Sequence, residues 1–393
     1  MLVILIRGIF RAVTGLLLGS TTTTSAQVDP YPRSLLQLGY DQSLSGHGPQ
    51  SLYVYYYYNS PAFLRTNVAL RLAVAPVYFD GELGFRQLLS PNTDVGIGLN
   101  GGGYGENYYE VRRGDYVKGE SFAGHGGGAS LNLYHRMNPA QFIPLNFVLK
   151  AGGRYSTYSA ADKTAPQFQL PKDRATPFTR AGLRFAGKEP MLYADLAMEM
   201  SVWYERQWRL DDSTYGFANN RRVQPTTDLY WLYAGLNYAW TNTGNQFTFG
   251  LTAGGSENAD RFSAYRLGGV LPLASEFPLT LPGYYYQEIS ARRFAHLSAA
   301  YVAPLSEDHR WQLRLGAASA YVDYLPGLEQ SGRWHTGVGP SLSFTSRSEV
   351  WRVILRYGYG FNAARDGHDG AHSVGLLYQY NFEQRKLRQQ KSR

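Results

Sequence analysis

Cysteine is absent from this chain of 393 residues, and charged residues make up only 17% of it. The absence of cysteine excludes a disulfide framework, thiolate zinc sites and thiol catalysis. Beyond the N-terminal region, no apolar stretch reaches the ~20 continuous residues that a membrane helix needs. Tyrosine (32 residues) and glycine (43 residues) are abundant instead. This composition favours one large all-β domain with many strands and turns.

The formal net charge of +8 is concentrated at the C-terminus. Residues 383–393, "EQRKLRQQKSR", contain five basic groups and one acidic group, so +4 of the +8 lies in this short tail. The rest of the chain is close to balanced. We therefore expect no nucleic-acid partner.

The N-terminus has the pattern of an export signal. Arg7 and Arg11 flank an apolar stretch that continues through "AVTGLLLG", and "TSA" at 24–26 offers small residues for cleavage before Gln27. Residues 1–26 are therefore expected to be a signal peptide, with a short membrane anchor as the alternative. An exported chain of this kind is soluble in the periplasm, secreted, or a barrel in the outer membrane.

Period-two alternation favours the barrel. In "EVWRVILRYGYGF" (349–361), apolar and aromatic residues occupy one face, and arginine and glycine the other. A soluble sandwich also alternates, but here the apolar positions end in Tyr, Trp and Phe, as in the aromatic girdles of transmembrane barrels. We predict a single 16-stranded antiparallel transmembrane β-barrel within residues 27–382. The expected strands are 35–43, 51–59, 64–76, 79–88, 93–103, 118–134, 143–158, 176–187, 190–208, 227–240, 245–256, 289–304, 309–323, 333–345, 349–361 and 371–382.

The lengths of the connections support this prediction. Long connections are expected on one side of the barrel, at 104–117, 159–175, 209–226, 257–288 and 362–370, and mostly short ones on the other. Short periplasmic turns and long outer loops are typical of outer-membrane barrels. An even number of strands places both termini, including the basic tail 383–393, in the periplasm.

The segment from residue 265 to residue 305 resembles the sixth outer loop and following strand of the outer-membrane assembly (Bam-type insertase) superfamily, which includes bacterial surface antigens. The matching residues are Leu267, Gly268 and Gly269, then Gly283 and Tyr284, then Tyr301, Pro304 and Leu305. The resemblance extends over about 262–382. It implies a loop between strands 11 and 12 that folds into the lumen, and a translocation or assembly role with partner proteins.

Two departures from the superfamily pattern bear on that role. Its motif arginine, which pairs with acids of the barrel wall, is replaced by Pro282, which has no guanidinium fork. Arg292 on the following strand is a candidate substitute. The roughly ten residues between the expected cleavage site and the first strand also cannot contain a polypeptide-transport-associated repeat. Both departures argue against a simple transfer of insertase or secretion activity.

The last strand and the lumen-facing charges also suggest partners and a solute preference. The last strand carries Tyr378, Tyr380 and Phe382 at alternating positions, which resembles the terminal signal that the barrel assembly machinery recognises. Outer-membrane lipid, lipopolysaccharide and a periplasmic or cell-surface protein are the other expected partners. A cationic lumen would favour anions if it is water-filled; the alternative is that its charges pair and fill the barrel. The expected lumen charges are Arg65, Arg71, Lys150, Arg154, Arg180, Arg184, Asp195, Glu199, Arg292, Arg314, Arg352 and Arg356.

Catalytic and metal-binding signals are poor. "GIGLNG" (96–101) fits a phosphate-binding pattern but lacks the following helix, and "HGGG" (125–128) lacks a G-x-S-x-G elbow. Asp366, His368 and His372 could approach a metal, although a glycine-rich turn explains them better. We therefore expect a non-enzymatic barrel without cofactor or metal, with a passive pore for small anions and a lipid-modifying enzyme as alternatives.

Overall fold

The computed structural model describes residues 32–48, 51–75, 78–137, 145–185, 198–240, 242–269 and 279–391. Sixteen long strands form the wall in this part of the chain. They are β1 (Arg33–Ser43), β2 (Ser51–Ser60), β3 (Val68–Ala75), β4 (Tyr78–Ser90), β5 (Thr93–Tyr108), β8 (Phe122–Arg136), β9 (Leu145–Ala160), β10 (Arg174–Phe185), β11 (Met198–Trp208), β14 (Thr226–Ala239), β15 (Gln246–Glu257), β17 (Ile289–Pro304), β18 (Trp311–Tyr324), β19 (Trp334–Thr345), β20 (Trp351–Arg365) and β21 (His368–Asn381).

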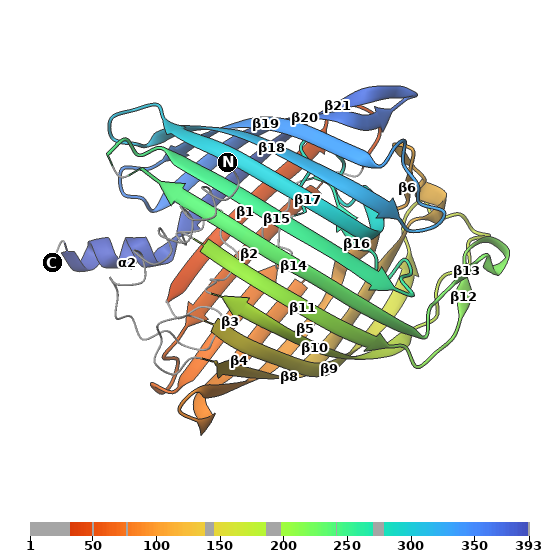
Figure 1. Ribbon diagram of the computed structural model, residues 1–393, viewed down its shortest axis with the longest axis horizontal. Helices are drawn as coiled ribbons and strands as arrows, with labels where there is room; N and C mark the ends of the chain where they lie inside the picture. Colours follow the sequence, from red (N-terminus) through yellow and green to blue (C-terminus); the bar gives the residue numbers. More distant parts are fainter. Residues whose placement is uncertain are drawn as a thin grey trace, which may run out of the picture.

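Each wall strand pairs antiparallel with the next, and β1 pairs with β21 from Leu35↔Asn381 to Ser43↔Ser373. This last pairing, which we call the seam, closes the sheet into the barrel seen in Figure 1. The predicted 16-stranded antiparallel barrel is thereby confirmed. Two predictions lie outside the described residues: the signal peptide at 1–26 and the lumen charge Asp195. No helix in the described part of the chain has the length and apolar character to cross a membrane.

The strand register separates two faces of the wall. Directly opposed residues share a face. Leu355 is opposite Leu376, and Leu376 is opposite Tyr40. The pairing of β1 with β2 and of β2 with β3 places Leu70 on this same face. Leu355 is 53% exposed, and similar apolar side chains recur on this face around the barrel. An apolar band of this extent is stable against lipid rather than water. The opposite face, with Arg71 and Arg356, lines the lumen.

Aromatic side chains border the lipid-facing band at the end with the short turns. Ring contacts join Tyr238, Trp240 and Tyr301 on one side of the barrel. Further contacts run from Trp311 through Phe344 and Trp351 to Tyr378, then from Tyr380 to Phe382 and Tyr56. Such a girdle is expected where the barrel meets the lipid headgroups.

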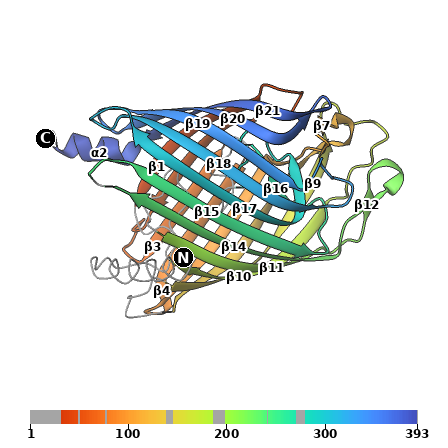
Figure 2. The same cartoon turned by 45° about the horizontal axis from the view of Figure 1, so that its top comes forward.

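The connections differ in length between the two ends, as predicted. Residues 109–121, 161–173, 209–225 and 258–288 form long connections at the outer end. They contain β6 (Val111–Arg112), β7 (Asp115–Tyr116), η1 (Lys118–Glu120), β12 (Thr214–Tyr215), η2 (Phe217–Asn219), β13 (Arg221–Arg222) and β16 (Tyr265–Leu267). Figures 1 and 2 show these at the end opposite α2 (Phe382–Lys391), which contains most of the basic tail.

One expected outer loop is absent. Residues 362–370 continue β20 and β21 as a paired hairpin, and only Asp366 and Gly367 remain between the strands. Both have positive φ, at +50° and +81°, as a tight turn between antiparallel strands requires. The glycine and aspartate residues that suggested a loop therefore mark a turn and an irregular register between Gly360 and Ala364.

Candidate functional site: the inserted loop and the seam

The connection between β15 and β17 comprises residues 258–288, and we call it the inserted loop; its described residues, 258–269 and 279–288, fold inward along the wall. Its strand β16 pairs with the start of β17. Its two arms are joined by backbone hydrogen bonds from Gly268 to Leu279, from Leu281 to Gly268 and from Gly269 to Tyr285. Leu267 and Leu281 are completely buried. The described arms of the loop therefore pack against each other around a small buried core.

The tip of the inserted loop lies directly on the lumen face of β19 and β20. Gly283 has φ +86°, and a Cβ there would lie 2.0 Å from the backbone nitrogen of Gly360. A Cβ on Gly337 would lie 2.2 Å from the carbonyl oxygen of Pro282. The Gly283 N–H donates to Ser373 Oγ at 3.2 Å. Only glycine permits such close backbone approach, so the wall glycines of β19 and β20 form a track that receives the tip.

A buried ion pair fixes the base of the loop. Arg365, at the end of β20, donates to both carboxylate oxygens of Glu288, at 2.8 and 2.7 Å, and both side chains are only 2% exposed. The guanidinium also lies 3.5 Å from the centre of the Tyr285 ring. The wall thus supplies the arginine and the loop supplies the acid, the reverse of the superfamily pattern. Bidentate arginine–carboxylate pairs are among the strongest polar contacts in proteins.

The inserted loop touches both sides of the seam. Tyr285 packs on the connection that follows β1: a Cβ on Gly46 or Gly48 would lie about 2 Å from its side chain, and its hydroxyl donates to the Ser45 carbonyl at 3.3 Å. A Cβ on Gly269 would lie 2.9 Å from the Asp41 carboxylate of β1. Because Arg365 lies on the β20–β21 side, Tyr285 is held between the first and last hairpins of the barrel.

A second polar group anchors the tip. The Tyr284 hydroxyl bonds to Nδ1 of His335 at 3.2 Å, and the Tyr324 hydroxyl bonds to Nε2 of the same imidazole. Tyr284 and His335 are each 1% exposed. Both imidazole nitrogens therefore have partners, and the buried polar atoms of this group are satisfied.

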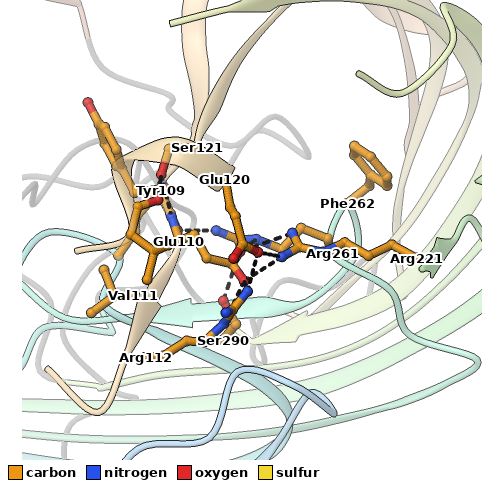
Figure 3. Close-up of polar contacts among 12 residues, drawn as sticks. Tyr109, Glu110, Val111, Arg112, Glu120, Ser121, Arg221, Arg261, Phe262 and Ser290 are labelled. Atoms are coloured by element: carbon orange, nitrogen blue, oxygen red, sulfur yellow. Dashed lines mark hydrogen bonds and ion pairs between the residues drawn. The ribbon is translucent and has the colours of Figure 1, made fainter. Parts of the chain in front are cut away.

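The outer end carries a charged cluster that joins three long connections (Figure 3). Glu110, 1% exposed, accepts from Arg112 at 2.9 Å and Arg221 at 3.0 Å and lies 3.4 Å from Arg261 Nε. Glu120 pairs with Arg112 and Arg221. Burial lowers the pKa of Arg261 to about 10, so its guanidinium remains charged at neutral pH. Residues 109–121, 209–225 and 258–269 are thereby held together.

An aromatic cluster lies beside these charges. Tyr108, Phe122, Phe168, Tyr215 and Val223 are buried together, with Phe262 of the inserted loop packed against them. Arg174 lies over the rings of Phe262 and Tyr158 at 4.7 and 5.4 Å. The cluster and the ion pairs form a cap in which the inserted loop is continuous with the outer loops.

Most of the expected lumen charges occupy lumen-facing positions, and several are paired. Arg71 pairs with Asp80 at 2.9 Å, Arg180 with Glu205 at 2.6 Å, and Arg184 with Glu199 at 2.9 Å. These pairs favour the paired lumen over an uncompensated cationic one. Arg314 bonds to Thr248 and Arg352 to Thr345, and the register also directs Lys150, Arg154 and Arg356 inward.

Two expected lumen residues lie elsewhere. Arg65 is exposed in the turn 61–67, because β3 begins only at Val68. Arg292 pairs with Asp323 at 2.8 Å on the lipid-facing side, since a register shift between Ala291 and Arg293 changes its direction. Arg365 and Glu288 make the contact for which Arg292 was a candidate. The Glu288–Arg365 pair was not predicted from the sequence, because 77 positions separate the two residues and because 362–370 was expected to be a loop.

The remaining sequence signals occupy wall strands. Residues 96–101 lie in β5 and residues 125–128 in β8. A side-chain pair not predicted from the sequence joins His125 Nε2 to Ser159 Oγ at 2.7 Å, on the lipid-facing side near the outer end. His372 bonds to Tyr357, and the described residues contain no group of three or more potential metal ligands. Tyr378 and Tyr380 face lipid, and Phe382 begins α2.

Comparisons with known proteins identify the fold but no family. No family model and no curated protein matches the sequence. Among solved structures, CdiB from Acinetobacter baumannii has a TM-score of 0.56 at 12% identity, over 88% of this chain and 60% of that one. BamA from Haemophilus ducreyi lacking POTRA domains 1–3 has a TM-score of 0.55 at 8% identity, over 88% of this chain and 70% of that one. CdiB from Escherichia coli has a TM-score of 0.51 at 14% identity, over 88% of this chain and 63% of that one.

The chain therefore spans 60–70% of the length of these solved structures. At these identities the likeness shows a shared fold. Together with the closed barrel and its lipid-facing apolar band, it identifies the protein as a multi-pass β-barrel of the outer membrane.

Proposed function

We propose that this protein is a barrel of the translocation or assembly type whose lumen is occupied by the inserted loop, and that it works with a polypeptide partner. The observation that carries the proposal is the docked loop: the Pro282–Gly283 tip on the glycine track and the buried Glu288–Arg365 pair. A passive pore has no need of a loop anchored across its own seam. The shared fold with BamA and CdiB is consistent with this class.

Photo-crosslinking in living cells tests the proposal. A photoreactive amino acid at Lys150, which faces the lumen, is expected to capture a polypeptide during growth. The same amino acid at Leu149, which is 39% exposed on the lipid-facing side, is the matched control. Capture only from position 150 supports passage or assembly of a polypeptide in the lumen. Absence of capture from both positions would count against the proposal.

A passive pore for small anions makes a different prediction. The intact protein in a planar bilayer would then show steady, anion-selective openings. We expect instead little conductance, with openings that appear after deletion of 262–285. Steady openings of the intact protein that deletion leaves unchanged would favour the pore.

The His125–Ser159 pair favours a lipid-modifying enzyme as a second candidate. A serine hydroxyl within hydrogen-bond distance of an imidazole is the arrangement of an activated nucleophile, and this one faces lipid. The hydroxyl would attack an ester carbonyl while the imidazole takes its proton; the ester C–O bond breaks, and the lipid alcohol leaves with that proton. Water, deprotonated by the imidazole, would then hydrolyse the acyl-serine to a free fatty acid and restore the serine hydroxyl. Lipid hydrolysis abolished by Ser159→Ala but not by Thr93→Ala, which removes the Thr93–His135 bond at the other end, would support it. Hydrolysis absent from the intact protein would leave the non-enzymatic proposal in place.

A further inference from the structure

A cluster of arginines lies on the lipid-facing side of the barrel at the outer ends of β17, β18 and β19. Arg292 and Arg293 come from β17, and Arg333 immediately precedes β19. Asp323 of β18 lies at their centre: it pairs with Arg292 at 2.8 Å, and its Cα is opposite that of Arg293. Three cations around one acid give the cluster a net charge of +2.

Contacts hold Arg333 close to this centre. Its carbonyl accepts the Val322 N–H at 2.9 Å, and its Nη1 donates to the Tyr321 hydroxyl at 3.4 Å. The hydrogen bond to Tyr321 and the charges of Tyr321 and Asp323 raise the pKa of Arg333. Arg292, Arg293 and Arg333 are all exposed. Their guanidinium groups are therefore available to a ligand that approaches from the membrane side.

Two aromatic side chains lie one step deeper in the membrane. The Cα atoms of Tyr321 and Trp334 are opposed, and their rings are 5.2 Å apart. Trp334 is 62% exposed and Tyr321 is 38% exposed, so both rings face lipid. Aromatic side chains prefer the boundary between acyl chains and headgroups. The arginines, farther out along the same strands, therefore lie at headgroup height.

The excess of positive charge distinguishes this patch from the next candidate on the outer rim. On β11 and β14, Arg206 lies 3.8 Å from Asp228, which also accepts from Tyr204. Glu257 of β15 lies opposite Asp228, so acids outnumber cations there. At the β17–β19 patch, two of three guanidinium charges remain uncompensated by Asp323.

We propose that Arg292, Arg293 and Arg333 form a binding site for the phosphate groups of a glycolipid of the outer leaflet, with Trp334 and Tyr321 against its acyl chains. Arginine suits this role because its planar fork binds phosphate oxygens in pairs and because it is weakly hydrated. The position at the outer end favours a phosphorylated glycolipid over inner-leaflet phospholipid. The proposal is independent of what passes through the lumen.

The test measures binding of fluorescent lipopolysaccharide to the full-length protein in mild detergent. The triple variant Arg292→Gln/Arg293→Gln/Arg333→Gln is expected to bind about tenfold more weakly, a modest loss for charge-assisted bonds at an exposed site. Arg206→Gln, on the neighbouring patch of β11 and β14, should bind like the wild type. Asp323→Asn removes the acid at the centre of the cluster and should tighten lipopolysaccharide binding. This variant keeps the site testable if the triple variant folds poorly.

Competition identifies the ligand group. Lipopolysaccharide stripped of its phosphates should bind as weakly to the wild type as the intact form does to the triple variant. Inorganic phosphate and phosphatidylglycerol, at the concentration of the labelled glycolipid, should displace little of it. Equal binding by wild type and triple variant, or equal binding of stripped and intact lipopolysaccharide, would overturn the site. Full displacement by phosphatidylglycerol would overturn its assignment to a glycolipid.

Discussion

The Glu288–Arg365 pair gives the sharpest test of the docked loop. In Glu288→Gln, the Arg365 guanidinium stays buried without a carboxylate. Breaking a buried pair by removing one partner costs about 3–5 kcal/mol, and both side chains here are 2% exposed with two short bonds between them. At ~1.4 kcal/mol per tenfold, the docked population falls relative to the undocked one by roughly 10²-fold to 4 × 10³-fold.

The absence of cysteine makes this change measurable. A Cβ on Gly339 would lie 3.4 Å from Cβ of Pro282, close to the ~3.8 Å separation in disulfides. It would also lie 2.6 Å from the Tyr357 carbonyl oxygen, so β20 must shift slightly to admit the side chain, equally in every variant compared in this background. The variant Pro282→Cys/Gly339→Cys should therefore crosslink spontaneously without other thiols to compete. We expect rapid, complete crosslinking when Glu288 is present and slow, partial crosslinking with Glu288→Gln.

Planar-bilayer conductance provides the functional readout. Glu288→Gln should open frequently, and oxidation of the added cysteine pair should close it again. The exchanged pair Glu288→Arg/Arg365→Glu should restore much of the closed state, because the charges remain matched. If Glu288→Gln crosslinks as fast as the parent and stays closed, the ion pair does not hold the loop, and the reasoning from its burial is refuted.

Four further predictions concern other parts of the barrel. Gly283→Ala should undock the tip, because φ +86° and a Cβ 2.0 Å from Gly360 N exclude a side chain; faster proteolysis of the loop would show it, with Gly367→Ala, which has open space around it, as the comparison. Leu355→Arg should destabilise the folded barrel by about 2–4 kcal/mol if the position lies near the bilayer midplane, whereas Arg356→Leu on the lumen face should cost less; urea unfolding in lipid vesicles measures both. Glu110→Gln should loosen the cap and increase hydrogen exchange in 109–121 and 209–225 together, while exchange confined to 109–121 would contradict the joint cap. Hydrogen bonds from Ser306 and Arg310 lower the pKa of Asp308 from 3.8 to about 2. The stabilisation that Asp308 gives to the 305–310 turn should therefore persist at neutral and mildly acidic pH and be lost as pH falls from about 4 to about 2. A carboxyl titration of Asp308 by NMR with a midpoint near 4 would refute this.

The sequence was sufficient for the wall because the wall obeys a local rule. A strand with lipid on one side and a crowded lumen on the other tends to alternate, and strands such as β3 and β20 show that pattern within their own residues. Where the rule is locally broken, the prediction failed. Alternation continues back to residue 64, so Arg65 was assigned to a strand, and the bulge beside Ala291 turned Arg292 toward lipid.

The site was only partly predictable, since its key contacts are not local. The Leu267–Gly269 and Pro282–Tyr284 segments could be identified by resemblance, and the structure brings them together through backbone hydrogen bonds of Gly268 and Gly269 with Leu279, Leu281 and Tyr285. The Glu288–Arg365 pair depends on how far the last hairpin extends. The His125–Ser159 bond depends on the register of β8 with β9. Neither distance can be obtained from the spacing of residues in the chain.

The place where the inserted loop docks constrains the order of assembly. Its receiving surface combines β19, β20 and the last hairpin with the connection after β1, segments that lie at opposite ends of the chain. That surface does not exist until the first and last strands have met. The Glu288–Arg365 pair joins elements of the last five strands and does not depend on closure. The contacts of Tyr285 with residues 45–48 cannot form in an unclosed sheet, so they require the completed barrel.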